Sequence, residues 1–100
     1  MRYGFFRGIW ELSGYSLKRY FETIEEFFSK CFQIIKNSTE NPFLRMIYCK
    51  FVHILAEKAD HITDYEIQKL VELYSSWGMD KNTLIQITEV LKEIRAKWKK

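Results

Sequence analysis

Hydrophobic residues recur at steps of three and four along residues 15–36, which is the period of one face of an α-helix. Ser16 belongs to the residue types that cap a helix start, and the polar run 37–40 is typical of a helix end. The pattern predicts an amphipathic helix of about 21 residues. Its apolar stripe consists of Leu17, Tyr20, Phe21, Ile24, Phe27, Phe28, Cys31, Ile34 and Ile35.

Residues 43–59 are apolar on most faces. Asn41 is a preferred N-cap, and Pro42 at the first helical position loses no hydrogen bond, so a second helix is expected to start here. Roughly 17 residues with several charges are too few to cross a bilayer. The segment therefore predicts the central helix of a bundle.

A third helix is expected over residues 64–77. Thr63 and Glu66 have the spacing of a capping box, in which each side chain accepts a hydrogen bond from the backbone of the other. Gly78 is suited to the position after the helix, with Met79 as the hydrophobic residue that follows. The predicted buried positions of this helix are Ile67, Leu70, Val71, Tyr74 and Trp77.

The last helix begins after Asp80, which is a good N-cap. Its apolar residues follow a spacing of three, four, three and four, which is the heptad pattern of a helix that packs along a seam. These residues are Leu84, Ile87, Leu91, Ile94 and Trp98.

The fold class predicted from these patterns is all-α: a compact bundle of four to five helices, the last two forming a helix-turn-helix hairpin. A single domain spans residues 1–100, with a helical core over 15–100. Residues 1–14 form a loosely packed N-terminal segment, with a short helix over residues 5–13 weakened by nearby glycines. The hairpin 63–77, Gly78, 80–98 resembles parts of some replication-initiation domains, and the chain resembles small basic helical subunits of RNA-guided effector complexes. Such likenesses concern the fold and imply no activity.

The amino-acid composition limits which classes of function are expected for this chain. The net charge of +3 comes from 16 basic and 13 acidic residues, which permits an acidic partner without requiring one. Aromatic residues make up 17% of the chain, a surplus for one small core, and surplus apolar side chains mark contact surfaces. Cys31 and Cys49 are interpreted as free thiols in a reducing compartment, so the expected location is cytoplasmic.

We find no motif for catalysis or for a cofactor, and we expect a non-enzymatic protein. The alternative chemistry is a metal site at His53, Glu57 and His61, whose steps of four bring them near one another on one helix face. The spacing differs from the zincin pattern, so the interpretation favoured here is a solvated helix face without a metal.

The predicted function is that of a small helical subunit of a macromolecular assembly. It would bind a protein partner, or itself, through Phe5, Phe6, Trp10, Tyr15 and Trp98. Basic edges would approach a nucleic-acid backbone, because cations interleaved with rings suit phosphates and bases. Those edges are Arg2, Arg7, Lys18, Arg19, Lys92, Arg95, Lys97, Lys99 and Lys100. The alternative is a peripheral membrane adaptor that uses the aromatic and basic residues 1–21 as an interfacial helix.

Overall fold

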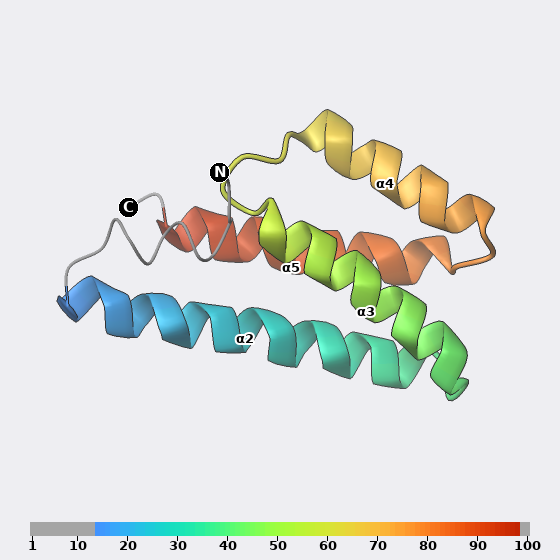
Figure 1. Cartoon of the computed structure of the whole chain (residues 1–100), viewed down its shortest axis with the longest axis horizontal. Helices are drawn as coiled ribbons and strands as arrows, with labels where there is room; N and C mark the ends of the chain where they lie inside the picture. Colours follow the sequence, from blue (N-terminus) through green and yellow to red (C-terminus); the bar gives the residue numbers. More distant parts are fainter. Residues whose placement is uncertain (1–13, 99–100) are drawn as a thin grey trace.

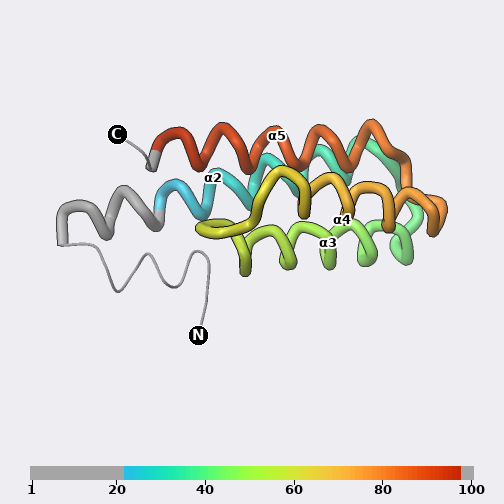
Figure 2. The backbone as a smooth tube through the Cα atoms, turned by 90° about the horizontal axis from the view of Figure 1, so that it is seen from above, coloured from blue at the N-terminus to red at the C-terminus, as the bar shows by residue number. Residues whose placement is uncertain are grey.

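A computed structural model of the chain describes the backbone of residues 14–98 and the side chains of residues 22–97. This part of the chain is entirely helical, with α2 (Gly14–Ser38), α3 (Pro42–Glu57), α4 (Asp64–Ser76) and α5 (Lys81–Trp98). The four helices form a bundle with extents of 42 × 26 × 22 Å (Figures 1 and 2). The expected all-α class is confirmed, while the helix expected over residues 5–13 lies outside the described residues.

The start of α2 differs from the expectation. Residues 14 and 15 are already helical, so Ser16 lies inside the helix and cannot be its N-cap. The apolar stripe predicts which residues are buried. It does not predict where the helix starts, because a helix can extend beyond its buried part. At the other end, Arg45 of α3 donates to the carbonyl oxygens of Lys36 and Thr39, at 3.2 and 2.7 Å, and so satisfies groups that the end of α2 leaves unpaired.

The caps of α3 and α4 agree with the prediction. The Asn41 side chain accepts hydrogen bonds from the backbone N–H groups of Phe43 and Leu44, and Pro42 is the first helical residue. The capping box of α4 is complete: Glu66 N–H donates to Thr63 Oγ1 at 3.1 Å, and Thr63 N–H donates to Glu66 Oε1 at 2.9 Å.

The connection from α4 to α5 is a Schellman motif. Gly78 has a φ of +97°, a conformation that favours glycine. The N–H of Met79 donates to the Tyr74 carbonyl oxygen at 3.2 Å, and the N–H of Gly78 donates to that of Ser75 at 3.0 Å. Met79 is 5% exposed, so this turn also buries its hydrophobic residue.

A polar link ties three helices together where α5 begins. Asp80 Oδ2 accepts from the backbone N–H and the hydroxyl of Thr83, at 3.0 and 2.8 Å. The N–H of Asp80 donates to the hydroxyl of Tyr48 in α3, at 2.8 Å. The Ser38 hydroxyl, at the end of α2, lies 2.6 Å from the Thr83 hydroxyl. Asp80 therefore caps α5 as expected, and its cap is built partly by α3.

The seam predicted for the last helix forms the middle of the core. Leu84, Ile87, Leu91 and Ile94 are fully buried. Both α3 and α5 contact all three other helices, whereas the described residues of α2 and α4 do not contact each other. The sequence predicts one central helix over residues 43–59, which is α3. In the structure, α5 is equally central.

Trp77 corrects the expectation for α4. It was predicted to be buried, yet it is 59% exposed. The helix ends at Ser76, so Trp77 is the C-cap residue and lies beyond the helical repeat that predicted its burial. Its ring packs against Tyr74, with the centroids 5.0 Å apart, and leaves most of its surface in solvent.

Within the described residues, none of the helices combines the length and the apolar character that a membrane crossing requires.

Candidate interaction surface

Most of the residues predicted to bind partners lie outside the described side chains. Phe5, Phe6 and Trp10 precede Gly14, while Tyr15 and Trp98 are placed only as backbone within α2 and α5. Among the predicted cations, Arg2, Arg7, Lys99 and Lys100 lie outside the described residues, and Lys18 and Arg19 lie in the first part of α2 without described side chains. The peripheral-membrane alternative concerns this same region.

Three predicted cations on α5 have described side chains. Lys92 is exposed and has no ion-pair partner among the described residues. Arg95 is half-buried, and its Nη1 atom is buried without a hydrogen-bond partner in the described structure. Lys97 is engaged in an ion pair. The three cations on α5 therefore differ in exposure and in pairing, although the sequence predicts that all of them approach a nucleic-acid backbone.

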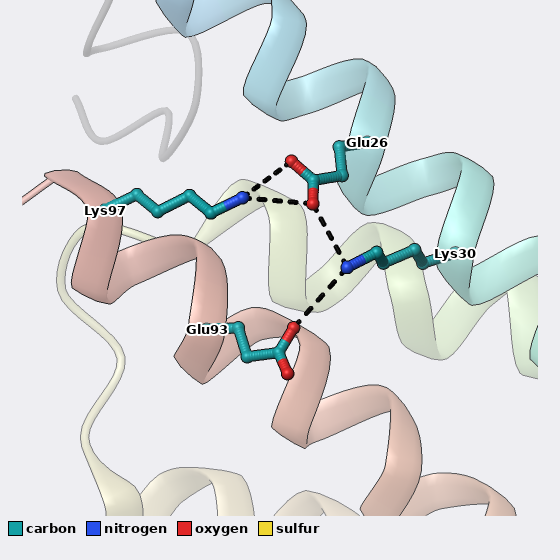
Figure 3. Close-up of polar contacts among 4 residues, drawn as sticks. All are labelled: Glu26, Lys30, Glu93 and Lys97. Carbon is teal, nitrogen blue, oxygen red and sulfur yellow. Dashed lines mark hydrogen bonds and ion pairs between the residues drawn. The ribbon is translucent and has the colours of Figure 1, made fainter.

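Lys97 belongs to a network of four charged side chains that joins α2 to α5 (Figure 3). Its Nζ lies 2.9 and 3.0 Å from the two carboxylate oxygens of Glu26. Lys30 Nζ lies 3.1 Å from Glu26 and 3.6 Å from Glu93, so positive and negative groups alternate across the two helices. A phosphate that bound Lys97 would have to compete with this carboxylate.

The ion-pair network shifts the pKa values of Glu26 and Lys30. Hydrogen bonds from Lys97, and then from Lys30, lower the pKa of Glu26 below its ordinary value. The hydrogen bond to Glu26 raises the pKa of Lys30. Each shift favours the charged form, because each partner stabilises the charge of the other.

The structure gives no support to the alternative of a metal site at His53, Glu57 and His61. In the described part of the chain, no group of three or more histidine, cysteine or acidic side chains is arranged to hold a metal ion. His53 Nδ1 lies 2.9 Å from the Cys49 carbonyl oxygen, and its ring packs 5.7 Å from that of Phe28. α3 ends at Glu57, so His61 falls in the following turn and pairs with Asp60 at 2.8 Å.

The two cysteines are free thiols of low reactivity. Burial raises the pKa of Cys31 to about 12, with a further contribution from the neighbouring Cys49. Burial also raises the pKa of Cys49. Because the thiolate is the reactive form, neither side chain has the character of a nucleophile near neutral pH.

The structure reveals an apolar surface that the sequence did not predict. Among the side chains of residues 22–97, seven large hydrophobic ones are exposed, and six of them lie within two helical turns of the 39–41 and 77–80 connections. Both connections lie at the same end of the bundle, at the right of Figure 1. We call this set the apolar end; it consists of Phe32, Phe43, Met46, Leu73, Trp77 and Ile85. The seventh, Tyr65, lies in the first turn of α4, at the end of that helix far from the 77–80 connection.

Local structure holds the main side chains of the apolar end in place. Phe43 follows Pro42 in the first turn of α3 and is 63% exposed, while Met46, one turn later, is 58% exposed. Trp77 is held by the Schellman motif and by its contact with Tyr74, whose ring in turn lies 5.1 Å from Phe51 of α3. The ring of Trp77 therefore rests on buried aromatic side chains, and a side chain that is already positioned suits a binding surface.

Comparison of the chain with protein-family models, curated proteins and solved structures finds no match.

Proposed function

We propose that this protein is a non-enzymatic subunit of a macromolecular assembly and that it binds a protein partner through the apolar end. The supporting observation is the exposure of Phe43 and Trp77, at 63% and 59%, at one end of a bundle whose core is otherwise well covered. Aromatic side chains and methionine are enriched at protein interfaces, and exposed apolar side chains gathered together mark such sites.

The exposed side chains of this surface can still contribute free energy to binding. Complete burial of a side chain such as phenylalanine contributes roughly 1.5–3 kcal/mol relative to exposure, and a few such anchors dominate most interfaces. Phe43, Met46 and Trp77 retain more than half of their surface in solvent, so each still has much of this contribution to give.

The test is affinity capture from the cells that produce the protein naturally, with quantitative comparison of three baits. The wild type and Tyr65→Ser should retain a common partner, and Phe43→Glu should lose it. Tyr65 is the matched control, because it is 69% exposed and lies in the first turn of α4, outside the apolar end. A partner set that is identical for all three baits, or an absence of any enriched protein, would contradict the proposal.

The proposal includes basic edges that approach a nucleic-acid backbone. Its support is the basic excess near the end of the chain and the exposure of Lys92, while the Glu26 ion pair opposes the participation of Lys97. Binding of labelled RNA and DNA at several salt concentrations tests it, since each phosphate contact adds roughly 0.7–0.9 to the salt slope. Lys92→Glu should reduce both affinity and slope; unchanged binding would remove this residue from the interface.

Three finer features belong to the same proposal. Residues 5–13 would form a fifth helix against the bundle, and α4 and α5 would act together as a helix-turn-helix hairpin. The protein would work in the cytoplasm, where free thiols such as Cys31 and Cys49 stay reduced.

A further inference from the structure

The apolar end consists of two corners with opposite charge. The α2–α3 corner carries Phe32, Phe43 and Met46, and residues 31–50 hold three basic groups and one acidic group. The α4–α5 corner carries Leu73, Trp77 and Ile85, and residues 69–89 hold two basic and three acidic groups. Each corner therefore carries exposed apolar side chains. The α2–α3 corner has an excess of basic groups and the α4–α5 corner has an excess of acidic groups, and such opposite charges attract one surface to another.

We propose that the apolar end binds a second copy of this chain, so that two bundles join end to end. This inference rests on the proposed function and names its partner. A two-fold axis that passes between the corners places the α2–α3 corner of each copy over the α4–α5 corner of the other. Such an isologous contact uses the same patch on both copies and closes after two subunits. It brings Phe43 toward Trp77 of the partner copy and basic groups toward acidic ones.

The available area suits a weak dimer. The bundle is 26 × 22 Å across its long axis, so the cross-section at one end is at most about 570 Å² and two copies cover at most about 1,100 Å². Specific interfaces begin near about 1,000 Å² of total buried surface. The dimer is accordingly expected to dissociate on dilution into the micromolar range.

Sedimentation equilibrium of the full chain tests the proposal at concentrations from about 1 µM to about 500 µM. The mass should rise from 12.2 kDa toward twice that value. Phe43→Glu and Trp77→Ser should each weaken association by at least about tenfold, as the loss of an interface anchor does. Tyr65→Ser should associate like the wild type, and circular dichroism shows whether each variant is folded.

Cross-linking of the unmodified sequence provides a second measurement that does not depend on variants. An equal mixture of ¹⁴N- and ¹⁵N-labelled protein is treated with an amine cross-linker, and mixed-label peptides identify links between copies. The expected link joins Lys36 of the α2–α3 corner to Lys81 of the α4–α5 corner. Mixed-label links that consistently omit these two lysines would place any self-association elsewhere and overturn the proposal.

A mass of 12.2 kDa at every concentration would likewise overturn it. If Phe43→Glu still lost a captured partner in that case, the apolar end would bind a different protein, and the proposed function would stand without the dimer. If the wild type captured no partner and stayed monomeric, both the proposed function and the proposed dimer would be contradicted.

Discussion

Replacing Tyr48 by phenylalanine isolates the polar link between α3 and the start of α5. The tyrosine is 3% exposed, and its hydroxyl accepts the N–H of Asp80 at 2.8 Å. The variant keeps the buried ring and removes only the acceptor, so a partly buried N–H loses its partner. An unpaired group of this kind costs about 1–3 kcal/mol. We expect the free energy of unfolding to fall by about 1.5 kcal/mol and, at about 4–8 °C per kcal/mol in a domain of this size, the Tm by about 6–12 °C.

Tyr74→Phe is the matched control. Tyr74 is 4% exposed and also packs its ring in the core, but its hydroxyl has no hydrogen-bond partner among the described residues. Its removal should change stability by less than about 0.5 kcal/mol. Urea unfolding followed by circular dichroism measures both variants under the same conditions. Equal losses in Tyr48→Phe and Tyr74→Phe would refute the reasoning, because the hydrogen bond would then contribute nothing specific.

Three further substitutions test other parts of the fold. Thr63→Ala removes half of the capping box and should cost about 1 kcal/mol, measured by urea unfolding; an unaffected midpoint would contradict this. Gly78→Ala meets no atom within 4 Å, so its expected loss of about 1–2 kcal/mol is purely backbone strain, and a gain in Tm would be the opposing result. Glu26→Gln should lower stability at about pH 6 by under about 1 kcal/mol. Because the pKa of Glu26 is lowered on folding, its contribution is present above the ordinary value of 4.5 and disappears as the pH falls through the folded value. The stability difference between wild type and Glu26→Gln should therefore shrink as the pH is lowered below 4.5. The exposed control Glu25→Gln should match the wild type at about pH 6.

Features governed by neighbouring residues were predictable from the sequence. The Thr63–Glu66 capping box, the Asn41 cap and the Gly78 turn all depend on chemistry within about one helical turn, and the structure confirms each. The seam of α5 was predictable for a similar reason, since a heptad spacing places its apolar residues on one face whatever covers them.

Features that depend on the tertiary arrangement were not predictable. Lys97 and Glu26 are 71 positions apart, and no local pattern shows that this lysine faces a carboxylate. The Tyr48 hydroxyl reaches the α5 cap across 32 positions. The exposure of Phe43 and Met46 also depends on which side of α3 the other helices cover, whereas periodicity shows only that the helix is apolar on most faces. The sequence therefore directed attention to the aromatic N-terminal segment, while the structure shows exposed apolar residues at the opposite end of α2.

The described residues of α2 and α4 do not contact each other, which has a consequence for how this fold tolerates variation. A substitution on α2 and a substitution on α4 share no neighbouring side chain unless both reach α3 or α5. Their effects on the free energy of unfolding should therefore add. A change in the α5 seam has no such freedom, because Leu91 and its fully buried neighbours belong to a helix that packs against three others. The two outer helices can therefore be redesigned almost as separate parts, while α5 has to be redesigned together with all of its neighbours.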